Sequence, residues 1–468
     1  MRARIVLTAL LSLCAGSAAA APARDRHDPT PPPLEENESR SVLSVLPRPG
    51  PDLDKARNEL KDRGVYFAAK YIGEVFGSTT GGQRRGTIYE GRVRYSLDVD
   101  FATLAGIDGL AFHTTGFQLH GKGIDAYYVG SLNPPSNIEA TPANRLYELW
   151  LQQSLIADKV NVRFGQLGSD QEFMYPEWGQ MFINGAFGWP TITASNLPGG
   201  GGPAYPLSSL GVRLRLTPVE NVSFLVSVLD GDPSGPQGPL DSPDPQRRNP
   251  DGLQFRLKDH PFLIGEGQFR YKIDGLDGSV KLGGWRHYGN FADLHYSSDW
   301  LSLADPNSNG LTLQRRGDHG LYAILDQKIG DGAGPGRGAG FFARASVAPG
   351  DRNLVSAYAD AGVSFVGVMK ARPDDLFGLA VGYARVSDAA RSFDRDTAFF
   401  NGVPTPVRSS EALVEATYIA KLAPGWSIQP DIQYIRRPGG NIADPRDPNG
   451  IAPARNSLVL GLRTLLRF

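Results

Sequence analysis

From residue 65 to its end, the chain alternates between apolar and polar side chains. Residues 92–101 show the pattern most clearly. One face of this segment carries Val93, Tyr95, Leu97, Val99 and Phe101, and the other carries Arg92, Arg94, Ser96, Asp98 and Asp100. Successive side chains of a β-strand point to opposite faces of a sheet, so a period of two predicts strands. The pattern therefore predicts an all-β fold.

The length of the alternating segments favours a membrane barrel over a β-sandwich. Further segments occupy 145–155, 210–217, 222–229, 267–273, 355–367, 410–422 and 426–435, and the last strand ends at Phe468. Several have about ten residues or more, near the length that crosses a bilayer at a tilt, whereas strands of soluble sheets have about 5–6. Short connections alternate with long ones, which are predicted as external loops at 121–144, 168–206, 230–250, 288–317, 388–409 and 438–455.

The number of strands is decided by the requirement that it be even. A direct count gives 17 candidates, but bacterial single-chain barrels have even numbers of strands. Segments 251–258 and 265–273 would both have to run toward the periplasm, so they form one crossing, or 251–258 belongs to an external loop. The prediction is an antiparallel transmembrane β-barrel of sixteen strands at 65–468, wide enough for an aqueous channel.

The first residues are typical of an export signal. Arg2 and Arg4 precede a short apolar stretch, and small residues around Ala20 form a cleavage site, so residues 1–20 are predicted to be a signal peptide. The only cysteine, Cys14, lies inside this segment. Lipid attachment at Cys14 is an alternative, although the preceding Leu13 is bulkier than such sites prefer. A mature chain without thiols can form no disulfide.

Two further segments precede the barrel. Residues 21–51 hold eight prolines and scattered charges, which predicts a disordered, Pro-rich linker. Residues 52–64 are predicted to form a short periplasmic helix, because Leu53, Ala56 and Leu60 recur at helical spacing before Gly64.

Several classes of function are not supported by the sequence. The net charge is −1, so no strong overall field favours nucleic acid. The seven histidines do not form a metal-ligand set, and no nucleophile elbow or phosphate-binding loop is present. We therefore predict no enzymatic activity, no cofactor and no metal.

The polar face of the strands should line the channel. It carries Arg92, Arg94, Asp98, Asp100, Glu148, Trp150, Arg163, Arg213, Arg215, Arg256, Arg270, Lys272, Lys281, Trp285 and His287. The loops at 121–144 and 168–206 are long enough to fold inward and narrow the pore, which would bring Trp178 and Trp189 into it. Guanidinium groups can hold adjacent sugar hydroxyls, carboxylates accept hydrogen bonds from them, and an indole face suits the C–H side of a pyranose.

The candidate substrate-binding residues are Arg92, Arg94, Asp98, Glu148, Trp150, Arg163, Trp178, Trp189, Arg213, Arg215 and Trp285. A simpler interpretation holds for each one alone. Charged pairs on a barrel wall can merely solvate the channel or brace one another, and the loop tryptophans can pack the loop against the wall. The prediction of sugar recognition therefore depends on the whole set.

Several stretches resemble the OprB family of carbohydrate-selective porins. They are 163–167 (RFGQL), 182–190 (FINGAFGWP), 211–218 (GVRLRLTP), 228–233 (VLDGDP), 317–327 (GDHGLYAILDQ) and 426–440 (WSIQPDIQYIRRPGG). The resemblance implies a sixteen-stranded outer-membrane pore that admits glucose and related sugars by passive diffusion. It also implies a constriction that contains Arg, Glu and Trp side chains.

The leading hypothesis is thus an outer-membrane channel for small neutral sugars. Two alternatives stay open: a general or weakly anion-preferring porin, and a structural or adhesive barrel with a plugged lumen. The expected partners are small neutral sugars, outer-membrane lipid and the barrel-assembly machinery, which would engage the C-terminal strand ending at Phe468. Association of barrels into a homo-oligomer is also open.

Overall fold

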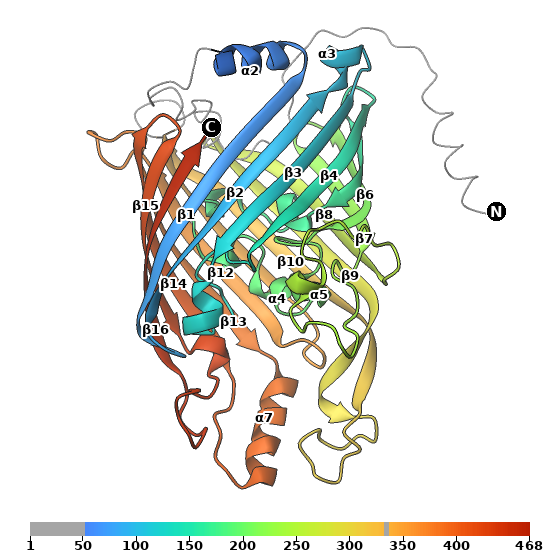
Figure 1. The fold of residues 1–468 in the computed structure, drawn as a ribbon, viewed down its shortest axis with the longest axis vertical. Coiled ribbons are helices and arrows are strands. Elements are labelled where there is room, and N and C mark those ends of the chain that lie inside the picture. Colours follow the sequence, from blue (N-terminus) through green and yellow to red (C-terminus); the bar gives the residue numbers. More distant parts are fainter. Residues whose placement is uncertain (1–51, 332–336) are drawn as a thin grey trace, which may run out of the picture.

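Sixteen antiparallel strands pair in chain order, and the first pairs with the last, so that the sheet closes into a barrel (Figure 1). The computed structural model describes residues 52–331 and 337–468. The strands are β1 (Val65–Gly82), β2 (Gly86–Asp100), β3 (Leu110–Gly121), β4 (Ala143–Leu155), β5 (Val160–Leu167), β6 (Ser209–Val219), β7 (Val222–Asp230), β8 (Pro261–Ile273), β9 (Leu276–Ser297), β10 (Thr312–Asp331), β11 (Gly338–Val347), β12 (Val355–Val366), β13 (Leu376–Val386), β14 (Ser410–Ala423), β15 (Trp426–Arg436) and β16 (Arg455–Arg467). The predicted fold and strand number are confirmed.

The helices are short, and none of them forms part of the wall. They are α2 (Asp52–Asp62), α3 (Phe101–Ala105), α4 (Thr191–Ala194), α5 (Pro198–Gly201), α6 (Pro245–Arg248) and α7 (Asp388–Asn401), with single turns η3 (Asp125–Val129), η4 (Ser169–Gln171), η5 (Glu177–Gly179), η6 (Gly185–Phe187) and η7 (Pro438–Gly440). None of the helices in the described residues has the length and apolar character needed to cross a membrane. Helix α2 lies within the segment predicted to be helical; the expected signal peptide and linker lie outside the described residues.

The barrel is closed by the pairing of β1 with β16, in which Lys70 lies opposite Arg467 and Phe76 opposite Gly461. The Phe76 ring covers Gly461 so closely that a Cβ there would come within 2.3 Å of the ring. Closure leaves no unpaired edge, which is the condition for an extended chain to cross hydrocarbon.

The two faces of the wall differ as a membrane protein requires. On β7, Phe224, Val226 and Val228 are exposed, whereas Leu225 and Ser227 between them are buried. Large apolar side chains on the outside would be unfavourable in water but dissolve in lipid. The outward face is therefore the lipid-facing one.

The two ends of the barrel also differ. Helix α2 and the C-terminus lie at one end, where the connections between strands are mostly short, and α7 and long loops lie at the other (Figure 1). In transmembrane barrels the short turns face the periplasm and the long loops face outward. This polarity makes the end with α7 the extracellular one.

Two connections fold into the barrel instead of extending from it. We call residues 168–208 the long inner loop and residues 122–142 the short inner loop. In the long inner loop, Ile183 and Phe187 are buried in one cluster with Phe342 and Leu413 of the wall. The packing of these apolar side chains holds the loop against the inner wall and narrows the channel.

Some boundaries differ from the predictions. Segment 251–258 contains no strand and is part of an external loop, in which Asp251 O accepts a hydrogen bond from Leu146 N (2.9 Å), so the loop alternative is the correct one. The loop expected at 288–317 is shorter, because β9 and β10 continue pairing as far as Ser297 and Thr312. The loop expected at 388–409 contains α7, and Phe101 starts α3 instead of ending β2.

Candidate functional site

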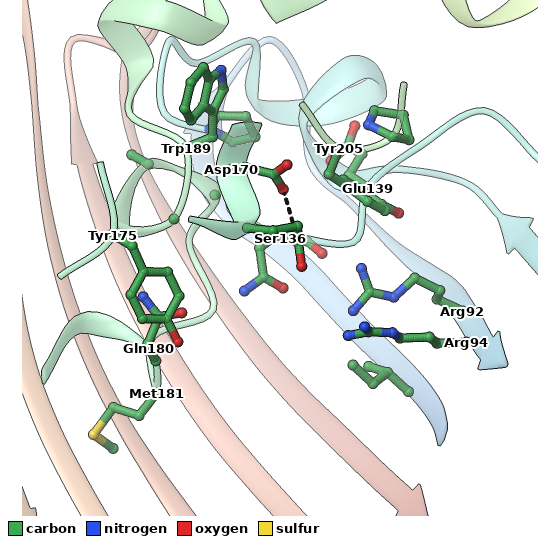
Figure 2. Close-up of a pocket in the computed structure, with 18 of the residues that line it drawn as sticks. Arg92, Arg94, Ser136, Glu139, Asp170, Tyr175, Gln180, Met181, Trp189 and Tyr205 are labelled. Atoms are coloured by element: carbon green, nitrogen blue, oxygen red, sulfur yellow. Dashed lines mark hydrogen bonds between the residues drawn. The ribbon is translucent and has the colours of Figure 1, made fainter. Parts of the chain in front are cut away.

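A cavity of about 820 Å³ lies inside the barrel between the wall and the two inner loops (Figure 2). Its charged lining residues are the basic Lys70, Arg92, Arg94, Arg215, Arg270, Lys281, Lys421, Arg463 and Arg467 and the acidic Asp125, Glu139, Asp170, Glu172 and Glu177. All the basic groups come from strands and all the acidic ones from the inner loops. The wall of the cavity is therefore basic, and the loops bring the carboxylates.

Arg92 and Arg94 lie on the inward face of β2 and point into the cavity side by side (Figure 2). The Arg92 guanidinium lies 5.1 Å from the Phe117 ring centroid and 5.0 Å from that of Tyr205. Cation–π contacts of this kind orient a guanidinium without neutralising its charge.

The side of the cavity facing these arginines carries Tyr175, Gln180 and Trp189 (Figure 2). The Trp189 indole is held by a hydrogen bond from Nε1 to Gly201 O (2.9 Å). Gln180 Nε2 donates to Pro176 O (2.9 Å), and this hydrogen bond orients the Gln180 amide. This side offers an aromatic surface and the amide of Gln180, which suit the C–H face and the hydroxyls of a sugar.

The inner-loop carboxylates differ in protonation. Burial raises the pKa of Glu139 to about 7, with a further contribution from the charge of Asp125, although its carboxylate accepts from Asp125 N (2.9 Å) and Ala126 N (3.0 Å). Burial also raises the pKa of Asp125 to about 6. Burial alone would raise the pKa of Glu172, but Arg213 and Arg163 outweigh it and bring the pKa to about 2. Near neutral pH the short inner loop is thus only partly charged.

Wall side chains hold the long inner loop in place. Arg344 of β11 donates to three loop carbonyls, at Met174 (2.6 Å), Ala186 (2.6 Å) and Gly188 (2.7 Å). Glu415 of β14 accepts from the backbone N–H groups of Ile183 (2.7 Å) and Asn184 (2.9 Å). Glu411, also on β14, holds the short inner loop by accepting from Leu132 N and Asn133 N (both 2.8 Å). Buried backbone without sheet partners needs such hydrogen bonds, so polar wall residues anchor the constriction.

The predicted substrate-binding residues fall into two groups. Four of them line the main cavity: Arg92, Arg94, Trp189 and Arg215. The other seven do not line this cavity. The alternation predicted that these side chains point inward, but it did not show which would meet the open space.

Glu148, Arg163 and Arg213 surround a separate small cavity of about 10 Å³ with Glu172. Arg213 holds Glu172 through two hydrogen bonds of 2.6 Å, from Nε and Nη2. Trp150 lies beneath this cluster, with the Arg163 guanidinium 3.7 Å from its ring centroid. The cluster supports the base of the long inner loop behind the main cavity.

The last predicted residues are engaged in packing or pairing. Trp178 packs its indole over Gly340, where a Cβ would come within 2.1 Å of the ring, so this tryptophan braces loop against wall. Trp285 is buried beside Phe262. Asp98 is on the inward face of β2 and accepts from His113 Nδ1 (2.6 Å).

Other residues of the predicted polar face are also placed. Arg270 and Lys281 line the cavity, while Lys272 pairs with Asp277 at the turn after β8. Asp100 caps α3 and His287 is buried on β9.

Arg256 is a correction. It lies in the external loop between β7 and β8 and pairs with Asp259 (2.8 Å), so it is not on the wall. The mistake follows from treating segment 251–258 as a strand.

Sequence reasoning missed other lining residues. Lys70, Arg463 and Arg467 continue the inward face of β1 and β16. The alternation of the last strand puts Arg463 and Arg467 on its polar face, but the predicted lining did not include them, and the same alternation could have identified Lys70. Ser136 and Glu139 come from the short inner loop, which has no period to follow. Among the described residues, no group of three His, Cys, Asp or Glu side chains is arranged to hold a metal ion.

Comparison with known proteins gives a consistent result. The family model described as carbohydrate-selective porin, OprB family, matches residues 84–468. Porin B of Pseudomonas aeruginosa is 24% identical over 428 residues, which cover 87% of this chain and 88% of Porin B. The high-pH structure of Pseudomonas putida OprB has a TM-score of 0.78 at 20% identity, covering 89% of this chain and 97% of that one.

The low-pH structure of the same protein has a TM-score of 0.53 at 16% identity and covers 90% of this chain and 98% of that one. At these identities the solved structures show the fold, whereas the family model spans most of the chain and nearly all of the barrel. The chain belongs to the OprB family of carbohydrate-selective porins.

Proposed function

We propose that this outer-membrane porin lets small neutral carbohydrates such as glucose diffuse passively through its lumen. The observation that carries the proposal is the lining of the main cavity. Guanidinium groups at Arg92 and Arg94 face an aromatic and amide surface at Tyr175, Gln180 and Trp189 across the narrowed lumen (Figure 2). This combination matches the hydroxyl-rich rim and C–H faces of a pyranose.

Rigid inner loops support selectivity by size. The hydrogen bonds from Arg344 and to Glu415 fix the long inner loop at several points, so the opening has a defined width. A barrel of sixteen strands without such loops would pass solutes of many kinds. The family and the barrel fold are typical of channels without enzymatic activity.

Swelling of liposomes that contain the full-length protein tests the proposal. Isosmotic glucose should enter faster than a zwitterionic amino acid of similar size. Equal rates would reduce the function to that of a general porin, and no swelling in either solute would contradict a channel altogether.

A weakly anion-preferring porin is the second candidate, and the excess of basic over acidic residues in the cavity lining favours it. The reversal potential of a planar bilayer under a KCl gradient distinguishes it. Strong chloride preference without faster sugar entry would support this candidate over the first.

Export and assembly are further parts of the proposal. Residues 1–20 would direct export and be removed, and the strand that ends at Phe468 would engage the barrel-assembly machinery. Helix α2 would lie in the periplasm, because it sits at the end of the barrel with the short turns (Figure 1). Mass spectrometry of the purified protein should find an N-terminus at Ala21, and one at Met1 would contradict the signal peptide.

A further inference from the structure

The outward face of β9 and β10 changes from apolar to basic toward the extracellular end. β9 follows the short turn after β8 and runs toward that end, and β10 returns beside it (Figure 1). Leu282 and Leu321 are strongly exposed on the lipid-facing part. Beyond them, Arg286 lies directly opposite His319, both exposed, and the exposed Tyr288 follows on the same face. Outward arginine is unfavourable in hydrocarbon but tolerated at the interface, where aromatic rings also gather, so this change marks the level of the headgroups.

A β-bulge turns a second arginine to the same outward face. The pairing of β10 with β9 shifts register between Arg316 and Asp318, at Gly317, whose φ of 71° lies in the left-handed region that favours glycine. Asp318 is buried on the inward face, so strict alternation would point Arg316 inward as well. The bulge instead places Arg316 opposite Asn290, and both are exposed. Bulges re-aim side chains in this way, often beside functional sites.

The bulge is held by the loop between β11 and β12. Arg352 Nη1 donates to Gly317 O (2.6 Å), and the Arg352 guanidinium is oriented by two hydrogen bonds of 2.8 Å to the Asp351 carboxylate. Arg286 Nη2 lies 3.7 Å from the position that a Cβ of Gly317 would take. The Arg286 guanidinium therefore lies over the bulge, next to the position of Arg316.

These two outward arginines keep their positive charge. Within the part of the chain that the structure describes, neither Arg286 nor Arg316 forms an ion pair with a carboxylate. Asp351, on the loop that holds the bulge, pairs with Arg315 (3.4 Å) and Arg352 (2.8 Å) instead. The outer wall therefore carries two positive groups side by side at the level of the headgroups.

We propose that Arg286, Arg316 and His319, here called the outer basic patch, bind the phosphate of an anionic lipid headgroup in the outer leaflet of the membrane. Anionic headgroups attract basic side chains at a membrane surface. A guanidinium can pair with phosphate through two parallel hydrogen bonds, and an imidazole N–H can donate a further one.

The surroundings of the outer basic patch favour a lipid over a free phosphate ion. The apolar outward face at Leu282 and Leu321 adjoins the patch and would contact the acyl chains of the same molecule. The Arg286 guanidinium lies 5.3 Å from the centroid of the Tyr288 ring, a contact that orients it without neutralising its charge. A phosphate ion could use the arginines but not the apolar face.

Native mass spectrometry of the full-length protein, refolded in a neutral detergent, can test the proposal. The two probes are lipid A with two phosphates and the same lipid after removal of both phosphates, so that their acyl chains are equal. The phosphorylated form should bind about thirtyfold more tightly, which is the effect of two basic groups at an anionic surface. A large excess of inorganic phosphate should not displace it.

Substitution identifies the residues responsible. In R286Q/R316Q the two forms of the lipid should bind almost equally. The matched control is R385Q/R391Q, which removes two arginines that pair with Asp388 at the extracellular rim and should keep the preference. Faster gel migration without heating, the mark of a folded barrel, checks that each variant folds. Glucose entry into liposomes should match the wild type in both variants, because none of these arginines lines the main cavity.

The outcomes separate this inference from the proposed function. Equal binding of the two lipid forms by the wild type, or a preference that survives in R286Q/R316Q, would overturn it. Displacement by inorganic phosphate would also overturn it, because the site would then be one for free phosphate. Absence of glucose entry through the wild type would contradict the sugar channel and leave the outer basic patch unaffected.

Discussion

The guanidinium of Arg163 lies 3.7 Å from the ring centroid of Trp150, on the neighbouring strand, and is fixed there by hydrogen bonds from Nε (3.1 Å) and Nη2 (2.7 Å) to Gln152 Oε1. Both residues face the lumen, yet neither lines the main cavity. Their contact supports the wall behind the channel. Its loss should therefore affect stability more than transport.

Trp150→Ala tests this separation. Removal of a buried Trp should lower the free energy of unfolding by about 3–5 kcal/mol, because the cavity it leaves cannot close fully. Urea unfolding in lipid vesicles would measure the change, and single-channel conductance should stay near that of the wild type. Trp300→Ala is the control, since that side chain is 63% exposed on an external loop. Equal midpoints for the two variants would contradict the assigned role.

Arg344 and Asp360 form an ion pair that is fully buried, and Arg344 also anchors the long inner loop. Arg344→Met should lower the unfolding free energy by about 3–5 kcal/mol, because it leaves the Asp360 carboxylate buried without its cation. Denaturant titration of the folded barrel would measure it. Asp360→Leu added to Arg344→Met should restore part of the loss, and a double variant less stable than the single one would contradict this account.

Glu415 should control the width of the channel, since it accepts two backbone N–H groups of the long inner loop. In Glu415→Ala these buried donors lose their partners, which costs about 1–3 kcal/mol each and favours loop positions away from the wall. Planar-bilayer recordings should then show noisier current of altered conductance. Glu220→Ala, in an exposed turn, should record as the wild type. If the current through Glu415→Ala is as quiet as that of the wild type, the long inner loop is held in place without the Glu415 carboxylate.

The ion selectivity of the channel should shift toward cations as pH rises. Burial raises the pKa of Glu139 to about 7 and that of Asp125 to about 6, so both gain negative charge between about pH 5 and 8. Reversal potentials at fixed KCl gradients should shift toward cations over this range. The negative charge of Glu74 on β1 also raises the pKa of Glu139.

The raised pKa of Glu139 also makes the stability of the folded protein depend on pH. The folded protein holds the Glu139 proton up to about pH 7, whereas the unfolded chain releases it near 4.5, so the contribution of this group to stability declines as pH rises through that window. Glu139→Gln should flatten both the reversal potential and this part of the stability profile. Glu220→Gln should not, and an unchanged profile in Glu139→Gln would assign the titration to another group.

The channel should also lose sugar affinity when its aromatic surface is removed. Trp189 is oriented by its bond to Gly201 O and lines the cavity. Glucose that occupies the cavity should reduce ion current, and Trp189→Ala should weaken this block about threefold, in the range of aromatic contacts. Current recorded against glucose concentration measures it. Trp300→Ala is again the control, and equal block in both variants would exclude an aromatic subsite at Trp189.

The fold was predictable because its pattern is local. Every second residue of a strand shares a face, so Arg92 and Arg94 could be placed on the inward side of β2 from their neighbours alone. Arg256 was misplaced for the same reason: a loop segment with alternating residues looks like a strand. Parity of the strand count pointed to that error.

The sequence by itself determined a sixteen-stranded barrel with an apolar outside and a polar inside, since each strand carries that information within its own length. Only the tertiary structure decided which inward residues meet open space. Whether Arg163, Trp178 and Glu139 line the cavity depends on where the inner loops fold, and these loops are held by hydrogen bonds to strands far away in the chain. Lys70, Arg94 and Arg467 likewise come to lie side by side only after β16 closes on β1, because no local period relates the two ends of the chain.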